Sequence, residues 1–266
     1  MDIKMVYGIV LILSIGLNVV VFFKYLSKLN YAYLWAQRFS RKAVIPECSL
    51  PEVDPIFRPG KFGTTLETEV HFVGRAGIPA LGAVRDSEAW ILAALAKKSR
   101  RILEFGTCTG RTTYLLAKNS PPGAVVTTLT LSPKMQEAFA VEKEDAALSI
   151  KQALEESVFT DFYYTGTSVE SKVKQLFMDS KQFDESEYVN SCDLIFVDGA
   201  HTYSYVLSDS RKALRMIKPG GLILWHDYFL IPGVTKGVYQ ALTELSSEYP
   251  LRSVRETTFA VYRKPV

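Results

Sequence analysis

Five short apolar runs alternate with helical segments between residues 101 and 225, and this alternation restricts the fold more than any other feature of the chain. The runs lie at 101–105, 124–131, 161–165, 192–197 and 221–225. Segments with apolar residues at helical spacing separate them, at 112–118, 134–149, 169–177 and 206–217. Strands that alternate with helices favour a parallel sheet covered by helices on both faces. The sequence therefore predicts an α/β, doubly wound, mostly parallel sheet, followed by a helix at 238–247 and a last strand at 258–262.

An uncharged apolar segment covers residues 5–23, well before the alternating region. As a helix it would be about 28 Å long, close to the thickness of the hydrocarbon core of a bilayer. We interpret it as a transmembrane helix. A cleaved signal peptide or a buried core helix is the alternative, although no small-residue cleavage site follows the run.

Basic residues concentrate around this segment. Residues 1–45 contain six Lys and Arg but only one Asp, whereas the whole chain has 31 Lys and Arg against 28 Asp and Glu. Five of the six basic residues follow the apolar run, which predicts that the rest of the chain is cytoplasmic. Aromatic residues lie between these basic residues, as in a helix that contacts lipid head groups, although a solvated linker helix has a similar pattern.

The chain divides into three parts on composition. Residues 1–45 are the predicted membrane anchor with its basic and aromatic continuation, and residues 46–85, rich in Pro and Gly, are predicted to be a linker and substrate-side cap. Residues 86–266 form the predicted catalytic domain. The small overall charge argues against a nucleic-acid partner, and three cysteines are too few for a disulfide scaffold.

The first strand end carries a glycine loop. Strand 101–105 contains Glu104 and leads through Gly106, Thr107 and Gly110 into a helix. Glycines at such a turn let a ligand approach the backbone, and free N–H groups at a helix start can bind polar groups. The spacing G-x-x-x-G differs from the dinucleotide fingerprint and from the phosphate-binding loop that ends in Gly-Lys-Ser/Thr.

The pattern Glu-x-Gly-x-x-x-Gly after an apolar strand resembles motif I of class I S-adenosylmethionine-dependent methyltransferases. Residues 192–227 resemble more closely the branch that includes macrocin O-methyltransferase, cephalosporin-hydroxylase-like proteins and catechol O-methyltransferase. The resemblance covers about residues 86–262 and implies a seven-stranded Rossmann-like sheet. It also implies that S-adenosylmethionine is the cofactor and that Glu104 and the loop from Gly106 to Gly110 bind its methionine end.

Two positions depart from the family pattern. Thr130 stands where relatives usually have an acid that binds the ribose hydroxyls, and loss of a charge-assisted hydrogen bond there could cost on the order of 1 to 2 kcal/mol. Ser168 follows the predicted third strand in Gly166-Thr167-Ser168, where relatives often have an acid after the glycine that contacts the adenine. Both residues are still predicted to contact the cofactor.

The resemblance assigns the metal and the base to the last two strand ends. In metal-dependent relatives, acids at the positions of Asp198 and Asp227 bind a divalent ion, usually Mg²⁺, and Asp198 also borders the cofactor. His226 replaces a more usual acid and is an uncertain third ligand, which would shift the preference toward Mn²⁺, Fe²⁺ or Zn²⁺. His201 stands where catechol-type relatives place a lysine base, so His201 and Asp198 are the predicted catalytic residues.

The leading hypothesis is therefore a membrane-anchored O-methyltransferase, facing the cytoplasm, that acts on a hydroxyl of a sugar, polyketide-like or lipid-linked small molecule. Its other partners would be membrane lipid and, with oligomeric state left open, a second copy of the chain. The main alternative is a catalytically silent, membrane-tethered binding module with a degenerate cofactor site. An iron-dependent oxygenase that uses His201, His226 and an acid is a third, weaker reading.

Overall fold

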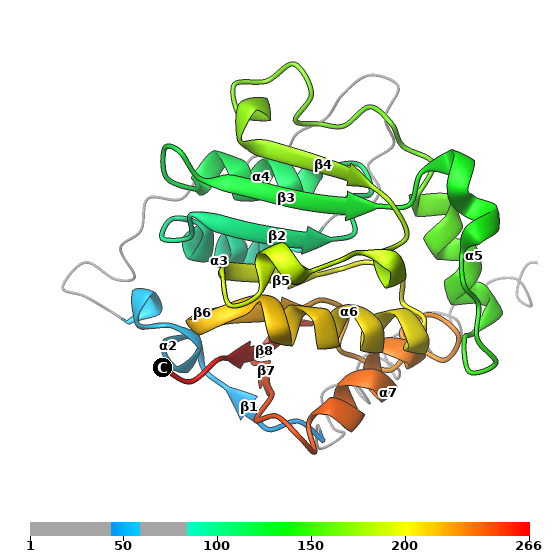
Figure 1. Cartoon of the computed structure of the whole chain (residues 1–266). Coiled ribbons are helices and arrows are strands. Elements are labelled where there is room, and N and C mark those ends of the chain that lie inside the picture. Colours follow the sequence, from blue (N-terminus) through cyan, green and yellow to red (C-terminus); the bar gives the residue numbers. More distant parts are fainter. Residues whose placement is uncertain (1–43, 59–83) are drawn as a thin grey trace, which may run out of the picture. The chain divides into compact units, whose positions relative to one another are not determined.

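A computed structural model describes residues 44–58 and 84–266 of the chain. Within these residues the strands form one eight-stranded sheet in the order β1-β7-β8-β6-β5-β2-β3-β4 (Figure 1). The strands are β1 Glu47–Cys48, β2 Arg101–Phe105, β3 Val125–Thr130, β4 Val173–Phe177, β5 Cys192–Val197, β6 Ile217–Trp225, β7 Arg252–Val254 and β8 Ala260–Arg263. All neighbouring pairs are parallel except those that β8 makes with β6 and β7.

Helices cover both faces of the sheet, as the alternation of strands and helices predicts. The α-helices are α2 Leu50–Val53, α3 Asp86–Ala96, α4 Arg111–Asn119, α5 Ala147–Glu156, α6 Tyr203–Met216 and α7 Lys236–Leu245, and short 3₁₀ turns lie between them. Ile102 and Leu194 pack with α3 and α4, whereas Leu103 and Ile195 pack with α6 and α7. Period-two alternation along each central strand thus supplies two separate cores. Helix α5 stands beyond the carboxyl ends of β3 and β4 (Figure 1).

The strand count and one strand assignment differ from the sequence prediction. The sheet has eight strands rather than seven, because β1, from the segment predicted as a linker, pairs with β7 at the edge. The predicted strand at 161–165 is instead a series of turns, and β4 lies at 173–177, where a helix was predicted. The apolar run at 161–165 arises because Phe162 and Tyr164 are buried against α3 and α4. It does not mark a strand. Since β4 is an edge strand and only partly buried, it lacks a clear alternating pattern.

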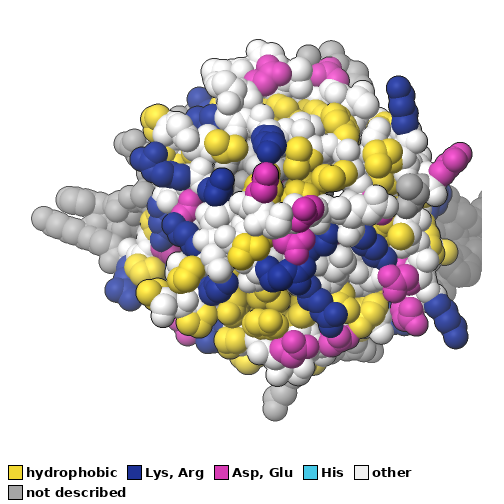
Figure 2. All heavy atoms as spheres, in the orientation of Figure 1, with side chains coloured by type: hydrophobic (Ala, Val, Ile, Leu, Met, Phe, Trp, Pro, Cys, Tyr) yellow, Lys and Arg dark blue, Asp and Glu magenta, His cyan; other side chains and the backbone are white. Residues whose placement is uncertain are grey.

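The predicted membrane helix at 5–23 lies outside the described residues. Among the helices in residues 44–58 and 84–266, none combines the length and hydropathy needed to span a bilayer. The face of the described domain shown in Figure 2 carries acidic and basic side chains interspersed with apolar ones.

Candidate active site

The glycine loop after β2 is fixed between the two neighbouring strands. Gly106 N–H donates to the Leu129 carbonyl of β3 at 2.9 Å, and Asp198 N–H donates to the Phe105 carbonyl at 2.9 Å. Gly106 has φ +98°, and a Cβ atom there would lie 2.1 Å from the Asp198 carbonyl oxygen. Only glycine fits, because the backbone of Asp198 and Gly199, which follow β5, lies against this residue. Gly110, at the start of α4, likewise leaves room for Phe162 and Tyr164.

Glu104 is fully buried beneath this loop. Its Oε2 atom accepts hydrogen bonds from the hydroxyls of Thr113 and Thr128, and Thr128 in turn contacts the Thr107 hydroxyl at 2.7 Å. Burial raises the pKa of Glu104 to about 8, although these two hydroxyl donors lower it. Its Oε1 atom has no hydrogen-bond partner among the described residues. Glu104 and Thr107 therefore lie in a polar network that supports the loop from below.

A pocket of about 580 Å³, including the solvent at its mouth, opens at the carboxyl edge of the sheet. Its wall includes Gly106, Thr130 and Asp198 from the predicted cofactor-binding residues. Thr107 is not among the lining residues because its hydroxyl faces Thr128 and Gln175. The pocket thus gathers the ends of β2, β3 and β5 in one place, as expected for the ligand site of a parallel sheet.

The position of Ser168 differs from the one expected for a residue that contacts the cofactor. It is exposed in the turns that precede β4 and does not line the pocket. Because the strand lies at 173–177 rather than 161–165, the residues that follow its carboxyl end are Met178, Asp179 and Ser180, and all three line the pocket. Asp179 is the acid that sequence reasoning missed, and its place directly after an apolar strand would have revealed it had that strand been assigned correctly.

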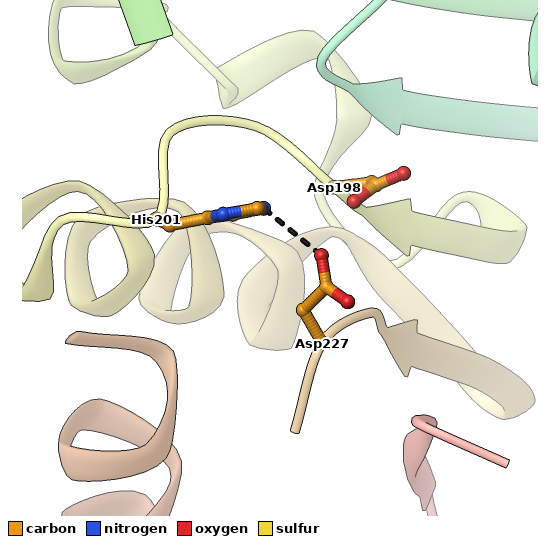
Figure 3. Close-up of side chains that lie close together, drawn as sticks. All are labelled: Asp198, His201 and Asp227. Carbon is orange, nitrogen blue, oxygen red and sulfur yellow. Dashed lines mark ion pairs between the residues drawn. The ribbon is translucent and has the colours of Figure 1, made fainter. Parts of the chain in front are cut away.

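Asp198, His201 and Asp227 come together at the ends of β5 and β6 (Figure 3). One ligand atom from each lies within 4.8 Å of the others, and His201 Nε2 is 3.2 Å from Asp227 Oδ2. These side chains are only 11% to 19% exposed. Asp227 adopts φ +57°, a left-handed conformation that Asp tolerates better than most residues and that is typical of functional turns. Two carboxylates and an imidazole at this spacing could hold a divalent cation.

His226, predicted as an uncertain third metal ligand, lies beside both acids of the cluster. Its Nδ1 atom lies 3.0 Å from Asp198 Oδ1 and 3.4 Å from Asp227 Oδ2, while Nε2 lies 3.3 Å from Glu88 Oε2. Both ring nitrogens therefore face carboxylates, and the group of side chains that could hold a metal contains His201. His226 bridges the buried Glu88 of α3 and the cluster.

The charges around the two histidines explain their protonation. Burial lowers the pKa of His226, but Asp198, Glu88 and Asp227 outweigh it and raise this pKa well above its ordinary value. Burial also lowers the pKa of His201, and its hydrogen bond to Asp227 with the neighbouring carboxylates produces a net increase. The pKa of Glu88 shifts downward. Burial raises this pKa, but His226 and two backbone N–H groups lower it to about 2. The carboxylates of Glu88 and Asp198 on either side of His226 thus favour its charged form.

Glu88 is a second residue that sequence reasoning missed. Glu88 lies in the first turn of α3, where it accepts a hydrogen bond from Arg85 N–H at 3.1 Å. It also accepts from Thr258 N–H at 2.6 Å, which connects α3 to the strand region at the C-terminus. Nothing in the local pattern around Glu88 indicates a partner 138 residues away in the chain.

Comparison with known proteins identifies a methyltransferase domain in the chain. Residues 103–228 match the family model described as a methyltransferase domain. No curated protein matches the chain. The solved structures that are similar include a putative O-methyltransferase from Klebsiella pneumoniae, with 21% identity, a TM-score of 0.49, and coverage of 71% of this chain and 84% of that one. Another is the O-methyltransferase of Bacillus cereus in complex with SAH, with 20% identity, a TM-score of 0.46, and coverage of 71% and 86%. A third is TomG of Streptomyces achromogenes, with 19% identity, a TM-score of 0.48, and coverage of 69% and 82%. At this distance the three structures assign no substrate to the chain.

Proposed function

We propose that the chain, whose residues 103–228 match a methyltransferase domain, is a class I S-adenosylmethionine-dependent methyltransferase that transfers the methyl group to a hydroxyl of a small molecule. The observation that carries this proposal is a pocket that extends from the glycine loop to Asp198, an acid that also belongs to the cluster with His201 and Asp227. A sugar, polyketide-like or lipid-linked molecule would serve as the acceptor.

The residues of the pocket fit S-adenosylmethionine, which supplies an electrophilic methyl group on a sulfonium centre. Gly106 and Thr130 both line the pocket, so the backbone at Gly106 could approach a ligand and the Thr130 hydroxyl would face the ribose. Asp179 is buried in the pocket wall and interacts with the Tyr205 hydroxyl, and its Oδ2 atom, which has no hydrogen-bond partner of normal geometry among the described residues, would accept a hydrogen bond from a ligand. A buried acceptor without a hydrogen bond lowers the stability of the folded protein, and a ligand that donates to it would remove this penalty.

His201 is the residue that would take the proton from the acceptor hydroxyl. Its Nε2 atom lies among the carboxylate oxygens, 3.2 Å from Asp227 Oδ2. With Nε2–H donating to Asp227 Oδ2, the unprotonated Nδ1 atom, which has no hydrogen-bond partner among the described residues, would take the proton, and Asp227 would orient the ring and stabilise the imidazolium that forms. The His226 ring holds Asp198 in place from the other side through its 3.0 Å contact. These residues thus orient and deprotonate the hydroxyl.

Asp198 and Asp227 would also hold a divalent cation, with His201 close enough to act as a third ligand. Carboxylate oxygens favour Mg²⁺, and the imidazole extends the range to Mn²⁺, Fe²⁺ and Zn²⁺. A bound cation supplies Lewis acidity, which lowers the pKa of a coordinated hydroxyl and fixes its orientation.

Titration of the full chain with S-adenosylhomocysteine tests the cofactor assignment. We expect a dissociation constant of about 1–100 µM by isothermal titration calorimetry, because the pocket encloses the ligand and offers unpaired acceptors. The absence of binding heat with about 1 mM ligand would contradict the proposal. In that case Thr130→Asp distinguishes the alternative, a silent binding module: if this variant also fails to bind, the cofactor site is degenerate.

Divalent cations test the metal assignment. We expect Mg²⁺ or Mn²⁺ at about 100 times its dissociation constant to raise the unfolding temperature by about 5–10 °C, since ligand binding stabilises the folded state. Asp198→Asn and Asp227→Asn should remove this increase in differential scanning fluorimetry. Asp184→Asn, at an exposed position outside the pocket, is the matched control and should retain it. An equal increase in all four proteins would show that the cations bind elsewhere.

Membrane anchoring through residues 5–23, with the catalytic domain in the cytoplasm, is part of the proposal. It rests on the uncharged run and the basic residues that follow it. We expect the full chain to stay in the membrane pellet after alkaline carbonate extraction and to be digested by protease added from the cytoplasmic side. Release into the supernatant would refute the anchor, and protection from the protease would refute the orientation.

A further inference from the structure

Two buried acids lie together in the wall of the cofactor pocket. Asp179 is 1% exposed and Asp209, on α6, is 2% exposed. Both line the pocket, and each has one carboxylate oxygen with no hydrogen-bond partner among the residues that the structure describes: Oδ2 of Asp179 and Oδ1 of Asp209. The proposed transfer chemistry uses neither oxygen.

The other contacts of these acids keep them in place. Asp179 Oδ1 accepts from Lys181 N–H at 2.9 Å, and Asp209 is hydrogen-bonded by Ser180. The Lys212 ammonium, the nearest strong cation on α6, instead donates to three backbone carbonyls, of Ser180, Lys181 and Phe183, at 2.6 to 2.8 Å. The loop that carries Asp179 is therefore tied to α6. Burial raises the pKa of Asp209 to about 7, which keeps a proton available on this acid near neutrality.

Aromatic and apolar side chains surround the acid pair. Phe139 and Tyr205 stack with ring centroids 4.4 Å apart and both line the pocket, as do Met178 and Leu131. The methyl group must meet its acceptor at the Asp198, His201 and Asp227 cluster, so the sulfur of the cofactor belongs at that side of the pocket. The adenine is the part of the cofactor with flat apolar faces and a polar edge, and the wall near Asp179 and Asp209 matches both properties.

We propose that Asp209 is a cofactor-binding residue that, together with Asp179, forms hydrogen bonds with the adenine. In this arrangement Asp179 accepts a hydrogen bond from the 6-amino group, and protonated Asp209 donates one to N1 of the ring. The inference rests on the proposed function, because it requires S-adenosylmethionine in this pocket. The contact of Asp209 with N1 would add a second hydrogen bond to the one at the 6-amino group, so that the site selects a 6-aminopurine.

The experiment pairs a change in the protein with a change in the ligand. Binding of S-adenosylhomocysteine and of its 1-deaza analogue, in which a C–H group replaces N1, is measured by calorimetry with the wild-type chain, Asp209→Leu and Asp209→Asn. We expect the wild-type chain to bind the analogue about tenfold more weakly than the parent ligand, since one hydrogen bond is lost. Asp209→Leu should bind the parent about tenfold more weakly and distinguish the two ligands by less than about twofold.

Asp209→Asn supplies the conservative test, because an amide can accept from Ser180 and still donate to N1. It should bind both ligands within about threefold of wild type. Asp54→Asn is the matched control: Asp54 is a fully buried acid outside the pocket, bound by Lys98 and Arg263, so its variant should keep the tenfold preference for the parent ligand even if its stability falls.

The outcomes separate this inference from the function on which it rests. If the wild-type chain binds neither ligand, the proposed function fails and the inference fails with it. If it binds both ligands equally, the cofactor assignment stands and the contact with N1 is refuted. Equal weakening of both ligands by Asp209→Leu would likewise assign Asp209 a structural role only. Should the leucine variant not fold, the wild-type comparison of the two ligands decides the question.

Discussion

Replacement of Gly106 by alanine is expected to abolish cofactor binding and to destabilise the domain by several kcal/mol, about the upper range for a single substitution. The new Cβ atom would lie 2.1 Å from the Asp198 carbonyl oxygen and 2.7 Å from Gly199 Cα. These are backbone atoms of the neighbouring strand end, so no rotamer change can relieve the contact. The strand ends that form the pocket would have to separate. Calorimetry with S-adenosylhomocysteine should show at least about a hundredfold weaker binding, and chemical unfolding should show the loss of stability.

A second glycine provides the control for this effect. Gly123 has φ +75°, similar in sign to the φ of +98° at Gly106, but no atom lies within 4 Å of the position that its Cβ would occupy. Gly123→Ala should therefore cost only the left-handed backbone preference, about 1 kcal/mol, and leave ligand binding unchanged. Similar losses in the two variants would show that backbone conformation, rather than contact between the strands, determines the requirement for glycine at residue 106.

Glu104→Gln is expected to stabilise the cofactor-free protein by an amount that grows with pH. Burial raises the pKa of Glu104 from 4.5 to about 8. Between these values the folded protein holds a proton on Glu104 that the unfolded chain has released, so wild-type stability falls by about 1.4 kcal/mol for each pH unit. Glutamine keeps a neutral group of similar shape and removes this dependence. The variant should equal wild type near pH 5 and exceed it by about 3 kcal/mol near pH 7.5.

Urea unfolding of both proteins across this pH range measures the difference. The comparison uses the difference between variant and wild type because Asp209, whose pKa burial also raises, contributes to the pH dependence of both proteins. Glu155→Gln, at a side chain that is 65% exposed, should show no comparable trend. A difference between Glu104→Gln and wild type that stays constant from pH 5 to 7.5 would mean that Glu104 is ionised in the folded protein.

The positions of the central strands and the residues at their ends could be predicted because local signals encode them. Strands β2 and β5 occupy the predicted ranges 101–105 and 192–197, since both are short, largely buried and mainly apolar runs followed by Gly or Asp. Asp198 and Asp227 follow such runs, so the rule that parallel strands end at one edge placed them together in advance. The structure confirms that proximity, with His201 between them.

The sequence by itself thus determined the doubly wound sheet, the glycine loop and the strand-end acids, because period, turn residues and apolar runs act over a few neighbouring positions. Only the tertiary structure decided that His226 connects the acid cluster to Glu88, since this contact joins distant parts of the chain. It also decided that β4 lies at 173–177, which brings Asp179 rather than Ser168 to the pocket. An edge strand and a buried acid are specified by neighbours far away in sequence, and no local pattern records those neighbours.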